Sequence, residues 1–87
     1  MKIKYTTQAV KTLKAYDENT RNLIRNKIYG LTKTPPEGDI KPLQGSKTQK
    51  RLRVGKYRVI YEHLEETQEE LKILMVNKID TRGDIYK

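Results

Sequence analysis

The sequence has no cysteine, no tryptophan and no phenylalanine, and it has one histidine and one serine. Without cysteine, a disulfide scaffold, a thiolate zinc site and a cysteine nucleophile are all excluded. A single histidine also cannot form a His/Cys metal site, so we expect no metal and no cofactor. No apolar run is long enough to span a bilayer, and residues 1–5 carry no signal-peptide segment. We therefore expect a cytoplasmic protein that is not attached to a membrane.

What the chain does have is positive charge. Its 87 residues allow one domain, predicted over residues 1–87, with a thin core because only 34% of the residues are hydrophobic. Lys and Arg number 19 against 11 Asp and Glu, which gives a net charge of +8. This bias indicates a polyanionic partner, such as nucleic acid, an acidic protein or an anionic membrane surface. Residues 41–58 contain seven basic residues and no acidic one, whereas five glutamates fall within residues 62–70.

Hydrophobic periodicity predicts a short edge strand over residues 2–5, followed by two helices. Asp17 is the predicted N-cap of the second helix, because its carboxylate can accept hydrogen bonds from the first backbone amides. Few residues join the helices, so we expect an antiparallel hairpin. Residues 34–39 end it, and residues 40–48 are predicted to be a loop with Leu43 turned inward. The apolar stripes are Ala9, Val10, Leu13 and Tyr16 in the first helix, and Leu23, Ile24, Ile28 and Leu31 in the second.

The second half of the chain is typical of strands. Residues 51–54 and 57–61 flank Gly55-Lys56, a two-residue link that suits a type II′ hairpin with residues 53 and 58 opposite each other. Alternation turns Leu52, Val54, Tyr57, Val59 and Tyr61 towards the helices and leaves Arg51, Arg53 and Arg58 on the open face. A central third strand is expected over residues 71–76, between a glutamate-rich loop and an irregular basic tail. The predicted fold is α+β, with the edge strand and helical hairpin on one face of a small twisted antiparallel sheet.

The chemical groups that remain are arginine, lysine and tyrosine. Guanidinium groups bind phosphate bidentately and can stabilise the extra charge of a phosphorane-like transition state. A tyrosine among such cations would have a lowered pKa and could exchange a proton with a ribose 2′-OH. A basic sheet face is also typical of plain nucleic-acid binding, so both interpretations stand at this point. The single histidine, His63, is interpreted as a surface residue and not as a catalytic base.

Three segments resemble the RelE/ParE toxin superfamily. Residues 42–45 read PLQG, residues 51–61 read RLRVGKYRVIY, and residues 78–86 read KIDTRGDIY. The resemblance extends over essentially the whole chain and is strongest to the RelE-type ribosome-dependent mRNA endonucleases. It implies a RelE-like fold, related to microbial ribonucleases, and a type II toxin that inhibits translation by cleaving mRNA in the ribosomal A site. The implied partners are a cognate antitoxin, mRNA and the ribosome, with the toxin monomeric or in a hetero-oligomer with its antitoxin.

The resemblance also implies roles for single residues. Arg58 matches the central phosphate-binding arginine, Arg82 the arginine that stabilises charge, and Tyr86 the tyrosine that stacks on the scissile nucleotide and assists proton transfer. Arg51 matches one of two catalytic basic residues on the first hairpin strand. Further RNA contacts are implied for Lys50, Arg53, Lys47, Lys78 and Lys87, although alternation turns Lys50 towards the helices. Thr81 stands where many relatives have histidine, and residues 43–48 contain no glutamate, so any catalysis would depend on Arg, Lys and Tyr.

Other interpretations remain open. ParE-type toxins share this fold and inhibit DNA gyrase without a nuclease site, and the pair formed by Arg82 and Tyr86 argues against that branch. A basic RNA-binding or ribosome-binding module without activity is a third possibility. Arg58 could instead form a structural ion pair with Glu62, and Tyr86 could simply pack the tail onto the sheet.

Overall fold

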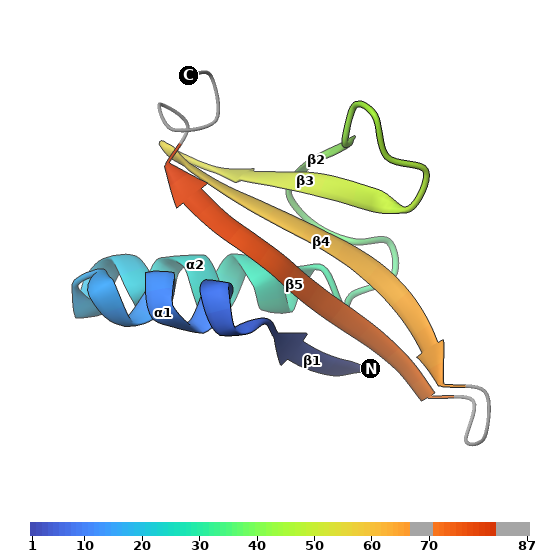
Figure 1. Ribbon diagram of the computed structural model, residues 1–87, viewed down its shortest axis with the longest axis horizontal. Coiled ribbons are helices and arrows are strands. Elements are labelled where there is room, and N and C mark those ends of the chain that lie inside the picture. Colours follow the sequence, from blue (N-terminus) through green and yellow to red (C-terminus); the bar gives the residue numbers. More distant parts are fainter. Residues whose placement is uncertain (67–70, 82–87) are drawn as a thin grey trace.

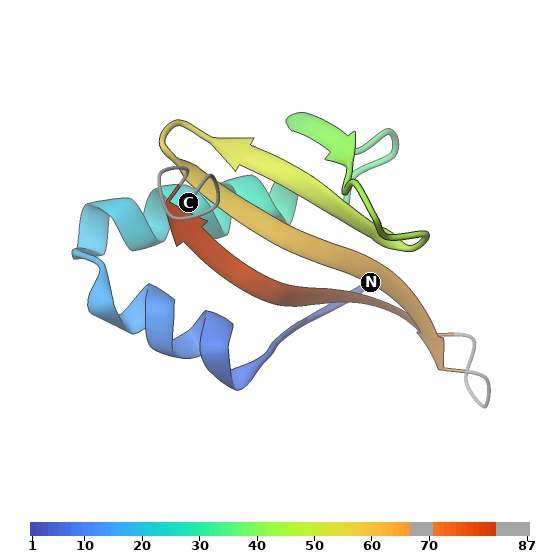
Figure 2. The same ribbon diagram turned by 45° about the horizontal axis from the view of Figure 1, so that its top comes forward.

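Two helices pack on one face of a five-stranded sheet (Figure 1). The computed structural model describes residues 1–66 and 71–81. The strand order across the sheet is β1-β5-β4-β3-β2. The elements in chain order are β1 (Lys2–Tyr5), α1 (Thr7–Ala15), α2 (Glu18–Gly30), β2 (Asp39–Pro42), β3 (Gln49–Val54), β4 (Tyr57–Glu66) and β5 (Leu71–Thr81). The predicted α+β class, the edge strand and the helical hairpin, visible in Figure 2, are thus confirmed.

Thr6 anchors α1 to the sheet. Its hydroxyl oxygen accepts a hydrogen bond from the backbone N–H of Ala9 at 3.2 Å, which caps the helix. The same hydroxyl donates to the carbonyl oxygen of Asn77 on β5 at 2.7 Å, and the Thr6 N–H donates to the Val76 carbonyl oxygen at 3.0 Å. Asp17 stands at the predicted N-cap of α2, but its carboxylate makes no capping hydrogen bond within the described chain.

The core lies between the helices and the sheet. In the β3–β4 hairpin Leu52 pairs with Val59 and Arg53 with Arg58, as predicted, and Tyr61 is also buried on the helix side. Tyr57 packs against this core, with its ring centroid 5.0 Å from that of Tyr16. The α2 stripe is confirmed for Ile24, Ile28 and Leu31, which are buried. The prediction that Leu23 belongs to this stripe is wrong, because Leu23 is 47% exposed.

The sheet differs from the prediction in direction and extent. It is mixed and not wholly antiparallel, because β1 pairs with β5 in parallel. Residues 39–42 form β2 at the edge, where Pro42 is tolerated because an edge strand need not donate every N–H. The predicted loop over residues 62–70 is wrong for 62–66, and β5 continues through residue 81 into the predicted irregular tail. The polar side chains of these residues do not end β4 or β5, because the two strands pair through backbone hydrogen bonds.

Gly38 lets the chain enter β2 against the core. Its φ of +128° lies in a region that L side chains rarely adopt, and a Cβ built there would meet the Leu52 Cδ1 at 2.6 Å. Gly45, in the turn before β3, has a φ of +86° and nothing within 4 Å of such a Cβ. The two glycines therefore share the backbone constraint, and only Gly38 adds a steric one.

This difference predicts unequal losses of stability. Gly45→Ala should lower the free energy of unfolding by about 1–2 kcal/mol, the penalty for a left-handed conformation. Gly38→Ala should lower it by about 1–3 kcal/mol more, because the added methyl group overpacks Leu52. Urea denaturation of both variants measures this. Equal losses would show that contact with Leu52 does not constrain position 38.

Candidate functional site

Three arginines lie on the sheet face opposite the helices, which we call the arginine face. Arg51 and Arg53 come from β3 and Arg58 from β4, and residues directly opposite in the register share a face. Two rows of paired residues therefore cross the strands from β2 to β5. The first row is Asp39, Arg53, Arg58 and Asp80, and the second is Lys41, Arg51, Ile60 and Lys78. The first row has two acidic and two basic residues, whereas the second has three basic residues, the uncharged Ile60 and no acidic residue.

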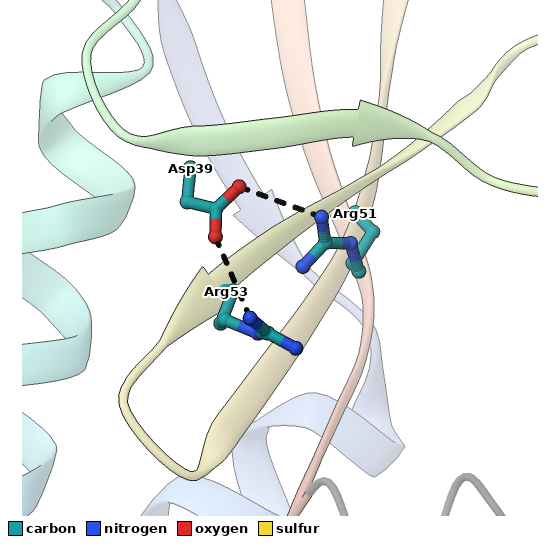
Figure 3. Close-up of polar contacts among 3 residues, drawn as sticks. All are labelled: Asp39, Arg51 and Arg53. Carbon is teal, nitrogen blue, oxygen red and sulfur yellow. Dashed lines mark hydrogen bonds and ion pairs between the residues drawn. The ribbon is translucent and has the colours of Figure 1, made fainter.

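Asp39 bridges the two arginines of β3 (Figure 3). Its Oδ1 lies 3.5 Å from Nη2 of Arg51, and its Oδ2 lies 4.0 Å from Nη1 of Arg53. Both distances exceed the 2.7–2.9 Å that is typical of a strong charge-assisted hydrogen bond. The Nε atom of Arg53 is buried and has no hydrogen-bond acceptor among the described residues. The Asp39 carboxylate therefore makes only long contacts with the two guanidinium groups. Their N–H groups can still donate hydrogen bonds to another anion.

The arginine face is less open than alternation predicted. Arg51 and Arg58 are each only 8% exposed, and Ile60 beside Arg51 is 7% exposed. Long arginine stems can lie along a neighbouring apolar surface while the guanidinium group stays at its edge. Arg51 and Arg58 are therefore held on the sheet surface, whereas the Arg53 side chain is 36% exposed.

The structure separates the other predicted site residues. Lys78 lies on the arginine face, where its Nζ contacts Oδ2 of Asp80 at 3.1 Å. Lys50 pairs with Tyr61 on the helix side of the sheet, away from the arginines, as the hairpin register predicted. Lys47 is exposed in the turn before β3. The remaining predicted site residues, Arg82, Tyr86 and Lys87, lie outside the described residues.

Asp39 is the site residue that the sequence reasoning missed. The sequence places it in the segment that ends the helix, because Pro35, Pro36 and Gly38 precede it. The available signal was the alternation of Asp39, Ile40 and Lys41, which is a strand pattern too short to stand out. Only the pairing of β2 with β3 brings this carboxylate to the arginines.

The described tyrosines with perturbed acidity do not have the lowered pKa expected of a proton-transfer residue. Burial raises the pKa of Tyr61. Burial also raises the pKa of Tyr5, although the charge of Arg25 and its hydrogen bond act in the opposite direction. The pKa of His63 is lowered by burial and then by the charges of Lys50 and Lys72. His63 pairs with Leu74, whose side chain belongs to the core on the helix side, so it is separated from the arginines.

Glu62 has partners other than Arg58. Its carboxylate accepts hydrogen bonds from the Thr48 hydroxyl at 3.0 Å and from Nδ2 of Asn77 at 3.2 Å. The described residues hold no group of three His, Asp or Glu side chains that could bind a metal ion. In the same part of the chain, no helix is long and apolar enough to cross a membrane.

Comparisons with known proteins give a family and a fold. A family model for the ParE toxin of the type II toxin–antitoxin system parDE matches residues 3–86. The chain is similar to one in the RelB–RelE antitoxin–toxin complex from Methanococcus jannaschii, with a TM-score of 0.70 and 23% identity over 97% of this chain and 95% of that one. No curated protein matches the chain significantly.

Two further complexes show the same fold. A chain of the RelBE2 complex from Mycobacterium tuberculosis gives a TM-score of 0.67 with 19% identity, over 93% of this chain and 96% of that one. A chain of the intact RelBE complex from E. coli gives 0.69 with 14% identity, over 92% and 94%. The sheet with its helical hairpin is therefore a RelE-like fold.

The loose bridge by Asp39 predicts a change in polyanion binding. Asp39→Asn removes a negative charge between Arg51 and Arg53, so binding to a single-stranded RNA oligonucleotide should strengthen. The slope of log K against log salt should steepen by about 0.7, the value for one more phosphate neutralised on a single strand. Fluorescence anisotropy at several salt concentrations measures this slope.

Glu37→Gln is the matched control. It removes the same charge from an exposed residue that pairs with Lys33 at 3.3 Å in the segment after α2. Its slope should stay at the wild-type value. The same steepening in both variants would mean that net charge, and not the arginine face, controls binding.

Proposed function

We propose that this chain, which belongs to the ParE toxin family within the RelE/ParE toxin superfamily of type II toxin–antitoxin systems, is a ribosome-dependent mRNA endonuclease. Its RelE-like fold supports this activity. The observation that carries the proposal is the arrangement of Arg51, Arg53 and Arg58 at adjacent register positions of β3 and β4. Guanidinium groups in such a cluster suit the phosphates of an RNA strand, because each can form two parallel hydrogen bonds to one phosphate.

The long contacts of Asp39 support the proposal that RNA phosphates can replace its carboxylate on the arginine face. Phosphate oxygens can approach Arg51 and Arg53 more closely than the carboxylate does, since its contacts are 3.5 and 4.0 Å. In the free protein the carboxylate reduces repulsion between the guanidinium groups. When RNA binds, its phosphates take over that role.

The proposed chemistry is cleavage by the ribose 2′-OH. The 2′-oxygen attacks the adjacent phosphorus in line, the bond from phosphorus to the 5′-oxygen breaks, and a 2′,3′-cyclic phosphate and a 5′-hydroxyl result. Arg58, with Arg51 and Arg82, stabilises the additional negative charge on the phosphate. Tyr86 stacks on the nucleotide and assists the transfer of a proton from the 2′-OH and to the 5′-oxygen. The ribosome contributes by aligning the mRNA for in-line attack.

The proposed partner of the free toxin is a cognate antitoxin. The three structural neighbours described above come from antitoxin–toxin complexes, and the net charge of +8 favours an acidic partner. Such a partner would cover the arginine face or dock on the helices. In either position it would prevent the toxin from acting.

Substitutions at the proposed site should relieve toxicity. Arg58→Ala, Arg82→Ala and Tyr86→Phe should each relieve the growth arrest caused by expressing the chain, because each removes phosphate binding or proton transfer. With purified protein and ribosomes, the wild type should leave mRNA fragments that end in a 2′,3′-cyclic or 3′-phosphate. Removing one such charged contact is expected to slow cleavage by about 10²–10³-fold.

Lys50→Ala is the control for this series. It removes a cation from the same strand as Arg51, but on the helix side of the sheet, so growth arrest should persist. If the Arg58, Arg82 and Tyr86 variants all remain fully toxic, the proposed site is wrong.

A second candidate is inhibition of DNA gyrase, which the match to the ParE model favours. A supercoiling assay with purified gyrase separates the two functions. The endonuclease proposal predicts unchanged supercoiling at toxin concentrations that cleave ribosome-bound mRNA. Inhibited supercoiling without any mRNA cleavage would establish the gyrase function instead.

A further inference from the structure

A hollow of about 430 Å³ opens on the arginine face beside Arg51. Its floor includes Ile60, which lies directly opposite Arg51 in the register. Consecutive residues on one face of a strand are about 7 Å apart, so the hollow lies one step along β4 from Arg58. The hollow is lined by Leu43, Gln49, Ile60, Asn77 and Lys78.

A β-bulge contributes Asn77 to the hollow. Ile60 pairs with Lys78, but the next residue, Tyr61, pairs with Val76, so Asn77 is an extra residue in β5. Bulges change the direction of a side chain and are frequent beside functional sites. The Nδ2 group of Asn77 donates to Glu62 at 3.2 Å, which fixes the side-chain amide and leaves its Oδ1 to accept a hydrogen bond from a ligand.

The lining combines three kinds of group. Leu43 and Ile60 provide an apolar surface, and Gln49 and Asn77 provide amides. The Gln49 side chain makes no hydrogen bond to any other described residue, so both its donor and its acceptor are available to a ligand. Lys78 adds a cation at the rim, with a side chain that is 56% exposed.

We infer that this hollow binds one nucleobase of an RNA strand whose phosphates lie on the arginine face. The inference rests on the proposed function, since it requires that this face bind RNA. An apolar surface suits the face of a base, and amide side chains can both donate to and accept from its hydrogen-bonding edge. Lys41, Arg51 and Lys78 flank the hollow with three positive charges, against the two carboxylates of Glu62 and Asp80, which hydrogen-bond to Asn77 and pair with Lys78, respectively. The excess of positive charge favours a ligand that carries phosphate next to its ring. Gln49 and Asn77 would then decide which base is preferred.

The inference is tested by titrating the isotopically labelled full chain with nucleotides. The probes are the four nucleoside 5′-monophosphates, and ribose 5-phosphate is the probe without a base. At least one nucleotide should bind about tenfold more tightly than ribose 5-phosphate, the gain typical of seating one base on a protein surface. Its addition should shift the NMR signals of the Gln49 and Asn77 side-chain amides.

Matched variants locate the effect. Gln49→Ala and Leu43→Ala should each bring nucleotide binding to within about twofold of ribose 5-phosphate binding. Gln44→Ala should retain the tenfold difference, since Gln44 is exposed in the same turn and does not line the hollow. Equal binding of nucleotides and ribose 5-phosphate by the wild type would overturn the inference. The inference would also be overturned if both the Gln49 and the Leu43 variants still bound the nucleotide about tenfold more tightly than ribose 5-phosphate.

The inference and the proposed function can fail separately. If nucleotides bind through Gln49 but ribosome-bound mRNA stays intact, the nuclease proposal fails and the base site stands. If mRNA is cleaved and nucleotides bind no better than ribose 5-phosphate, the base site fails and the nuclease proposal stands.

Discussion

The register of the β3–β4 hairpin is the constraint on which both the core and the site depend. The link Gly55-Lys56, with a φ of +58° at Gly55, sets Leu52 opposite Val59 and Arg53 opposite Arg58. A slip of one residue would turn every side chain of a strand to the other face. A register that separated the arginines would also remove Leu52 and Val59 from the core. The buried pair therefore keeps the arginines on one face.

This register also creates an electrostatic problem that the neighbouring strands β2 and β5 reduce. Like charges directly opposite each other in a sheet are destabilising. Here Arg53 and Arg58 are opposite, and their row ends in Asp39 on β2 and Asp80 on β5. The carboxylate of Asp39 lies near two guanidinium groups without a short bond to either. Because its charges are balanced, this row of residues does not oppose folding in the absence of ligand. Because the contacts of Asp39 are long, a phosphate can still replace its carboxylate beside the arginines.

The parts of this fold that could be predicted from sequence are those set by neighbouring residues. Alternation around Gly55 predicted the hairpin, its register and the shared face of Arg51 and Arg58. The parallel direction of β1 depends on pairing with β5, about 70 residues later in the chain, and no local pattern encodes it. Asp39 was missed for the same reason, since it joins the site only through strand pairing. The roles of Arg82 and Tyr86 came from the family resemblance and remain predictions.

The bulge at Asn77 connects the helical layer to the arginine face. The backbone carbonyl of Asn77 accepts the hydroxyl hydrogen of Thr6, which also caps α1, and its side chain donates to Glu62. Glu62 in turn accepts from Thr48, in the turn before β3. One residue outside the regular ladder is thus held by the helical layer through its backbone and by β4 through its amide. An unpaired residue would ordinarily weaken a strand, but here each of its polar groups named above has a partner. The wall of the hollow that Asn77 forms is therefore supported by the same contacts that attach α1 to the sheet.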